Sequence, residues 1–211
     1  MKPFTVLHVC MGNICRSPMA ERLLVARLRE TLGSGADDLV VSHGAGTGDW
    51  HVGDPMNPPA ARQVRSRGGD PDSFRARVLV ARYVEDSDLV LTATAEQAEF
   101  VVRMWPAAGE RTFVLGEFGR LAAEVDPDAL PPFAPTAEAV AARGRALVAA
   151  VHARRDGTAP DVLDDLDDPW GRPEPYFART ADAVERHLAP LVRALSDVDD
   201  HGSSGQVPRR T

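Results

Sequence analysis

The chain has 211 residues, 44% hydrophobic and 26% charged, a composition typical of a globular domain large enough to bury a core. Its formal net charge of -7, with no run of Lys or Arg, argues against a nucleic-acid-binding face. No apolar stretch approaches the ~20 residues of a membrane helix, and the first residues lack a signal-peptide core. Two cysteines five positions apart make no disulfide framework, so we expect a reducing cytoplasm.

Strand-like and helix-like patterns alternate along the first half of the chain. Short apolar runs predict four strands, at residues 4–9, 39–42, 89–92 and 112–115, the last ended by Gly116. Periodic apolar positions and helix-start signals predict helices at 19–32, from about 58 to 67, at 80–86 and at 95–104. A glycine-rich loop is expected after the second strand, from Gly44 to Gly53.

The second half is expected to contain fewer strands. Residues 121–135 are rich in proline and acidic residues, which predicts a surface connection, and helices are predicted at 136–155 and 180–195. The polar residues 197–211 are expected to be disordered. We therefore predict a single domain over 1–196, with a longer connection around 117–165. Its fold class is α/β: a doubly wound, Rossmann-like, four-stranded parallel sheet with helices on both faces.

The segment from Cys10 to Pro18 is the most informative part of the chain. It joins the end of a buried strand to the start of a helix, where ligands bind in doubly wound sheets. Backbone N–H groups and the positive end of the helix dipole would converge there on an anion. The same field favours the thiolate of Cys10, so the loop predicts covalent attack on phosphorus.

The other loop residues suit the same chemistry. The guanidinium of Arg16 can pair with two phosphoryl oxygens and stabilise charge during transfer. Gly12 and Asn13 are expected to adopt left-handed conformations, and Ser17 to donate a hydrogen bond to the Cys10 sulfur. The expected phosphate-binding residues are Met11, Gly12, Asn13, Ile14, Cys15 and Ser17.

Three segments of the chain resemble the low-molecular-weight protein tyrosine phosphatases. They are residues 9–21, which contain Cys10-Met11-Gly12-Asn13-Ile14-Cys15-Arg16-Ser17-Pro18, residues 42–53, and Asp167-Asp168-Pro169-Trp170-Gly171. The resemblance implies the fold of that family and hydrolysis of phosphotyrosine monoesters through a cysteinyl-phosphate intermediate, with no metal or organic cofactor. It implies a tyrosine-phosphorylated protein or peptide as partner, neither nucleic acid nor membrane, and favours a monomer.

An acid is needed to protonate the leaving oxygen, an effect worth about 10²–10⁴-fold. The residues alone do not choose among the acidic side chains Asp161, Asp164, Asp165, Asp167 and Asp168. The resemblance selects Asp168, with Asp167 as the fallback. It also places Trp50 and Trp170 at the two sides of the cleft, where aromatic walls would favour phosphotyrosine over the shorter phosphoserine.

Some residues depart from the family pattern or stay ambiguous. Phe74 stands where relatives carry a histidine that braces the loop asparagine, so Asn13 is expected to rely on Ser17 and Ser42. His8 is expected to be a satisfied core histidine. Cys15 is either a small packed hydrophobe or a redox partner that forms a disulfide with oxidised Cys10.

Two other functions fit the loop. An arsenate reductase uses the same fold and loop, but it needs further cysteines to carry oxidising equivalents, and this chain has two. A non-hydrolytic phosphocarrier or anion-sensing module would be phosphorylated on Cys10 and pass the group on. An acid at Asp168 argues against this carrier or sensor, whereas absence of any turnover with aryl phosphates would argue for it.

Overall fold

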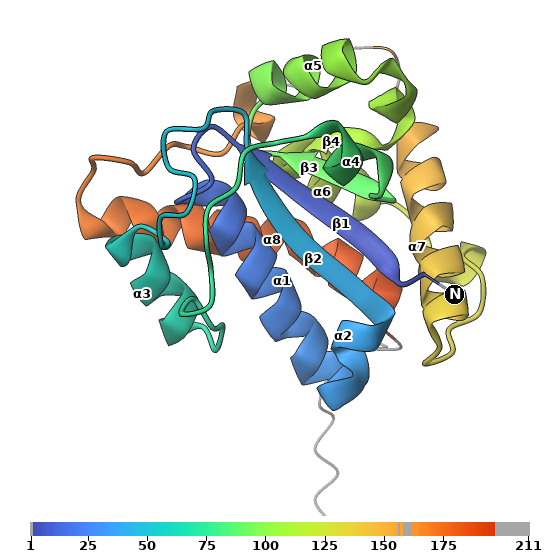
Figure 1. The fold of residues 1–211 in the computed structure, drawn as a ribbon. Coiled ribbons are helices and arrows are strands. Elements are labelled where there is room, and N and C mark those ends of the chain that lie inside the picture. The colour runs from blue at the N-terminus through green and yellow to red at the C-terminus, as the bar shows by residue number, and fades with distance from the viewer. Residues whose placement is uncertain (1, 156, 158–161, 197–211) are drawn as a thin grey trace, which may run out of the picture.

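The computed structural model describes residues 2–155, 157 and 162–196 (Figure 1). The tail predicted at 197–211 lies outside these residues. A four-stranded parallel sheet forms the centre, in the order β2-β1-β3-β4. Its strands are β1 (Phe4–Cys10), β2 (Val40–Gly46), β3 (Leu89–Thr92) and β4 (Thr112–Val114). The predicted fold class is confirmed.

Eight α-helices and four short 3-10 helices connect or follow the strands in the described part of the chain. The α-helices are α1 (Arg16–Leu32), α2 (Ala36–Leu39), α3 (Pro58–Ser66), α4 (Ala81–Glu85), α5 (Ala95–Met104), α6 (Leu115–Ala122), α7 (Ala137–His152) and α8 (Glu174–Leu195). The 3-10 helices are η1 (Gly33–Gly35), η2 (Pro106–Arg111), η3 (Pro127–Ala129) and η4 (Val162–Asp164).

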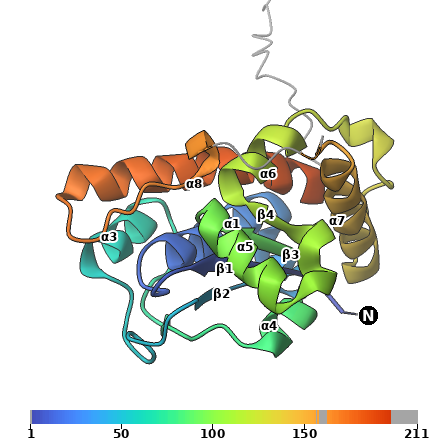
Figure 2. The same ribbon diagram turned by 90° about the horizontal axis from the view of Figure 1, so that it is seen from above.

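The side chains of β1 alternate between two hydrophobic clusters, because successive residues of a strand point to opposite faces. Phe4 and Val6 pack into the larger cluster with α1, α6, α7 and α8, whereas Leu7 and Val9 pack with residues of α4 and α5. Figure 2 shows α8 along one side of the sheet and α4 on the other. All seven residues of β1 are buried, so the loop that follows it starts from a rigid support.

Several boundaries differ from the sequence predictions. The predicted second strand, 39–42, is wrong at both ends: Leu39 closes α2, and β2 continues to Gly46, which pairs with Cys10. An added Cβ on Gly46 would lie 2.7 Å from the Met11 carbonyl oxygen. Gly46, which the sequence placed in a loop, therefore lets β2 pack closely against the loop that follows β1. The last helix begins at Glu174, six residues earlier than predicted, with a proline in its first turn.

The largest omission is α6. Residue 115 was expected to end the fourth strand, but Leu115 begins α6 and Gly116 lies inside it. An added Cβ on Gly116 would lie 2.3 Å from the backbone oxygen of Asp164, so glycine is required for close packing rather than to end a strand. Glu117 accepts a hydrogen bond from the backbone N–H of Val114, which fixes the start of the helix.

The predicted connection around 117–165 contains a helix that covers the sheet. Gly144 of α7 lies against Phe4, since an added Cβ there would lie 2.6 Å from the Phe4 ring. This segment completes the larger cluster over the start of β1. Within the described residues, no helix is both long enough and apolar enough to span a bilayer.

Candidate functional site

The loop between β1 and α1 has one residue in the left-handed region, Asn13, with φ 52°. The prediction of a left-handed Gly12 is wrong. An added Cβ on Gly12 would lie 3.0 Å from Cδ2 of His51, which is closer than an ordinary van der Waals contact. His51 therefore lies directly on the loop, and it lines the cavity above it. Sequence reasoning missed His51 as a site residue, although it follows Trp50 in the second motif.

The carbonyls of the loop point away from its centre. The oxygens of Cys10, Met11 and Ile14 accept hydrogen bonds from the backbone N–H groups of Thr47, Gly48 and Asn57, each at 2.9 Å. A trans peptide points its N–H opposite to its C=O. The N–H groups that follow these carbonyls are therefore directed into the loop, where α1 also begins. This arrangement is an anion-binding site of the kind predicted.

A chain of hydrogen bonds runs to the sulfur of Cys10. The backbone N–H of Arg77 donates to Oδ1 of Asn13 at 2.9 Å, and Nδ2 of Asn13 donates to Oγ of Ser17 at 2.8 Å. The Ser17 oxygen lies 3.0 Å from Sγ of Cys10. A thiolate at Cys10 can only accept a hydrogen bond, so the Ser17 hydroxyl would be its donor and would stabilise it.

The expected brace on Asn13 is partly wrong. Ser17 supports it, but Oγ of Ser42 donates to the Glu21 carbonyl at 3.1 Å and contacts Nε2 of His8 at the same distance. The second brace is the backbone N–H of Arg77. Because this contact comes from the backbone and not from a side chain, the sequence could not reveal it. Phe74 is fully buried and packs into the larger cluster.

His8 is a core residue, but its hydrogen bonding is only half satisfied. Nε2 contacts Ser42, whereas Nδ1 has no partner among the described residues. Burial, with a smaller effect of His43, lowers the pKa of His8 to about 3. The ring is therefore neutral at physiological pH and takes no part as a proton donor.

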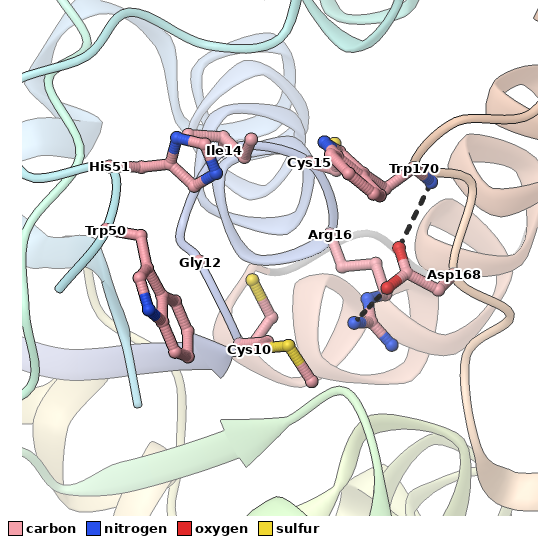
Figure 3. Close-up of a pocket in the computed structure, with 10 residues that line it drawn as sticks. Cys10, Gly12, Ile14, Cys15, Arg16, Trp50, His51, Asp168 and Trp170 are labelled. Atoms are coloured by element: carbon pink, nitrogen blue, oxygen red, sulfur yellow. Dashed lines mark hydrogen bonds and ion pairs between the residues drawn. The ribbon is translucent and has the colours of Figure 1, made fainter. Parts of the chain in front are cut away.

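Arg16 and Asp168 lie side by side in the lining of the cavity (Figure 3). Nη2 of Arg16 lies 2.8 Å from Oδ2 of Asp168, and Nη1 donates to the Leu166 carbonyl at 3.4 Å. The other carboxylate oxygen, Oδ1, accepts from the backbone N–H of Trp170 at 3.1 Å. The guanidinium is almost wholly buried, while about half of the Asp168 side chain is exposed. The carboxylate thus lies where it can meet either Arg16 or an incoming ligand.

The structure separates the acidic residues that the sequence could not. Asp164 is buried and pairs with Arg120 at 2.8 Å, and Asp165 accepts from the backbone N–H of Ala95 at 2.8 Å. The backbone N–H of Leu166 also bonds to the carbonyl of Ala93. These contacts tie the segment to the carboxyl end of β3. Asp168 alone of this acidic run lines the cavity, and Asp161 lies outside the described residues.

Two tryptophans rise from opposite sides of the cavity (Figure 3). Trp50 comes from the loop after β2 and is 70% exposed, and Trp170 comes from the loop before α8 and is 62% exposed. Gly171 after Trp170 has φ 73°, a conformation that an aromatic residue would adopt only with strain. The cavity also takes in Cys10, Met11, Gly12, Ile14, Cys15, Arg16 and His51.

Cys15 is a buried thiol in the lining of the cavity. Burial and the neighbouring Cys10 and Asp168 raise its pKa to about 12, against a smaller opposite effect of Arg16. Both cysteines are free. Cys15 is therefore a protonated thiol at neutral pH.

The site combines a thiol at the base of an anion-binding loop with an arginine and an aspartate beside it. These features define the class of proteins in which a cysteine acts on a bound oxyanion. Within the described residues, no group of three or more His, Cys, Asp or Glu is arranged to hold a metal. The model of the low molecular weight phosphotyrosine protein phosphatases matches residues 5–156. The chain belongs to that family. The match ends before Asp168, so the placement of that residue depends on the geometry above.

Relatives of known name agree. The low molecular weight protein-tyrosine-phosphatase of Streptomyces coelicolor is 32% identical over 165 residues, 74% of this chain and 98% of the relative. Low molecular weight protein-tyrosine phosphatase A of Mycobacterium tuberculosis is 45% identical over 76 residues, 36% of this chain. That match spans 45% of the mycobacterial protein, less than half of its length.

Solved structures share the fold. A low molecular weight protein tyrosine phosphatase from T. tengcongensis has a TM-score of 0.63 and 22% identity, covering 90% of this chain and 98% of that chain. The YwlE arginine phosphatase from Geobacillus stearothermophilus has a TM-score of 0.62 and 22% identity, covering 92% and 93%. At these identities the likeness supports the fold alone.

Proposed function

We propose that this protein is a protein tyrosine phosphatase that hydrolyses phosphotyrosine monoesters through a cysteinyl-phosphate. The observation that carries the proposal is the directed hydrogen-bond chain through Asn13 and Ser17 to the sulfur of Cys10, beneath a loop whose N–H groups face inward. It holds a thiolate in the place where a phosphoryl group would bind. Family membership supports the same activity.

In the first step, the Cys10 thiolate attacks phosphorus in line with the aryl oxygen. The S–P bond forms as the P–O bond breaks, and Arg16 with the loop N–H groups stabilises the charge on the three remaining oxygens. Asp168, protonated, gives its proton to the departing phenolate. The oxyanion would replace the Asp168 carboxylate on Arg16, which releases this side chain toward the leaving group.

In the second step, water attacks the phosphorus of the cysteinyl-phosphate. Asp168, now a carboxylate, takes a proton from that water, and the S–P bond breaks to return the Cys10 thiolate. Inorganic phosphate then leaves the loop. Ser17 supports both steps, since its hydrogen bond stabilises the same thiolate as nucleophile and as leaving group.

The walls of the cavity support an aromatic substrate. Trp50 and Trp170 stand above the loop on opposite sides, and a phenyl ring attached to phosphate could lie between them. The physiological substrate we propose is a phosphotyrosine protein, acted on by a monomer in the cytoplasm. The two free cysteines suit a reducing compartment.

The alternatives have less support. Arsenate reduction needs a further thiol to receive oxidising equivalents, and the sequence contains only Cys10 and Cys15. A phosphocarrier or anion sensor would gain nothing from an acid beside the leaving group, yet Asp168 lies 2.8 Å from Arg16.

The test compares a phosphotyrosine peptide with matched phosphoserine and phosphoarginine peptides. We expect release of inorganic phosphate from the phosphotyrosine peptide, and no release in Cys10→Ser. Asp168→Ala should keep substrate binding and lose turnover by about 10²–10⁴-fold. Turnover of phosphoarginine alone would overturn the substrate assignment. An Asp168→Ala variant that works at the parent rate would overturn the assignment of the acid.

A further inference from the structure

Trp50 is folded back over Gly48. An added Cβ on Gly48 would lie 1.8 Å from Cζ3 of Trp50 and 2.3 Å from both Cε3 and Cη2. All three atoms belong to the six-membered ring of the indole. The ring therefore occupies the space that any side chain at residue 48 would need.

Space is the reason for glycine at this position. The glycines with positive φ are Gly33, Gly53, Gly68, Gly157 and Gly171. Gly48 is not among them, so its backbone conformation suits other residues. An alanine would keep the backbone and change only what lies against the indole.

The peptide under the indole is fixed to the catalytic loop. The N–H of Gly48 donates to the Met11 carbonyl, and that of Thr47 to the Cys10 carbonyl, both at 2.9 Å. Trp50 itself is largely exposed. The contact with Gly48 therefore sets where the indole stands relative to Cys10.

We infer that Gly48 is a specificity-determining residue, which acts by seating Trp50 as one wall of the cleft. The inference depends on the proposed function, because it assigns the wall to an aryl substrate. Carbon atoms in contact are about 3.5–4.0 Å apart, so a methyl group at residue 48 moves the ring by more than about 1 Å. The flexible, exposed indole can move without unfolding the loop.

The experiment uses Gly48→Ala, with Gly35→Ala as the matched control. Gly35 has φ -82° and no atom within 4 Å of an added Cβ. We expect Gly48→Ala to lower kcat/KM for a phosphotyrosine peptide about three- to tenfold, mainly through KM, the range of one lost aromatic contact. The inhibition constant of inorganic phosphate should change less than about twofold, because phosphate does not reach the wall.

A double-mutant cycle tests whether the effect passes through Trp50. In a Trp50→Ala background, Gly48→Ala should cost nothing further, because there is no indole left to move. Equal losses in both backgrounds would overturn the inference. So would a matching loss of phosphate affinity, which would place the damage in the loop.

A fluorescence measurement separates this inference from the proposed function. In a Trp105→Phe/Trp170→Phe background, Trp50 is the remaining tryptophan. Lifting the indole off Gly48 exposes its second face, so Gly48→Ala should increase acrylamide quenching while Gly35→Ala leaves it unchanged. Unchanged quenching in Gly48→Ala would overturn the inference that Gly48 positions the Trp50 indole. Increased quenching in a protein that hydrolyses no aryl phosphate would overturn the proposed function and the aryl specificity that rests on it, but not the contact by which Gly48 positions Trp50.

Discussion

Asp168 cannot pair with Arg16 and protonate a leaving oxygen at the same time. In the structure its carboxylate pairs with Arg16, whereas general acid catalysis requires it to face the leaving oxygen. A bound phosphoryl dianion would take over Arg16 and favour a protonated Asp168 beside it. In the proposed mechanism, the ion pair is the resting arrangement of the two residues, and the substrate would break it.

This competition predicts a variant that binds oxyanions more tightly but turns over substrate more slowly. Asp168→Asn removes the charge that pairs with Arg16, so inorganic phosphate or vanadate should bind about two- to fivefold more tightly, the scale of a half-exposed ion pair. Turnover should fall at the same time by about 10²–10⁴-fold. Inhibition constants and kcat measured on the same preparation check both parts. Weaker oxyanion binding would contradict the competition.

A second prediction concerns Cys15 and the recovery of the enzyme from oxidation. Peroxide would convert the Cys10 thiolate to a sulfenic acid, and the Cys15 thiol would condense with it, forming a disulfide and releasing water. Inactivation should therefore be reversed by a thiol reductant, and Cys15→Ser should recover less activity. Because the pKa of Cys15 is raised to about 12, the condensation should be slow at neutral pH. Full recovery of Cys15→Ser would remove the role.

At the level of elements, α6 packs against the segment that leads to Asp168, the proposed acid. Gly116 packs on the backbone of Asp164, and Arg120 of the same helix pairs with the Asp164 side chain. Both contacts precede Asp168 by a few residues. The position of the acid therefore depends on a helix that the sequence did not reveal.

Gly116→Ala tests this support. Its Cβ would lie 2.3 Å from a backbone oxygen, which no side-chain rotation relieves, so the segment must move. We expect kcat to fall about tenfold or more, since small misplacement of a catalytic group has effects of this size. Phosphate inhibition should stay within about twofold. Gly109→Ala is the control, because its nearest neighbour would be at an ordinary 3.8 Å. Equal effects of the two variants would contradict the role of α6.

Local patterns predicted the strands and the loop because their signals lie in adjacent residues. The apolar run of β1, the Gly12-Asn13 pair and Ser17 are such signals. The missed parts depend on contacts between distant segments. Gly46 extends β2 because it meets Met11, Gly116 lies inside α6 because it meets Asp164, and Arg77 braces Asn13 through its backbone. No pattern of side chains near these residues reports such contacts.

Over the whole molecule, the buried His8 and the half-buried His43 make the fold sensitive to acid. Burial lowers the pKa of His8 to about 3, and burial with Arg77 and Lys2 nearby lowers that of His43 to about 4. In the unfolded chain both rings take a proton near pH 6.5. The unfolded state therefore binds more protons as the pH falls below that value, and stability declines toward pH 4.

His8 should account for a measurable part of this decline. Between pH 7 and pH 5 its contribution is about 2 kcal/mol, from the difference between the folded and unfolded pKa. Urea unfolding at both pH values should show a smaller loss of stability in His8→Gln than in the parent. His51→Gln, a substitution at the cavity rim, serves as the control. An identical pH dependence in His8→Gln and the parent would contradict the buried, neutral ring.

In the proposed mechanism, Cys10 accepts the phosphoryl group. Rapid acid quench of the enzyme with an aryl phosphate, followed by mass spectrometry of its peptides, tests this role most directly. We predict a transient gain of one phosphoryl group on the peptide that contains Cys10, and none in Cys10→Ser. Hydrolysis without that adduct, or an adduct on another residue, would contradict the account.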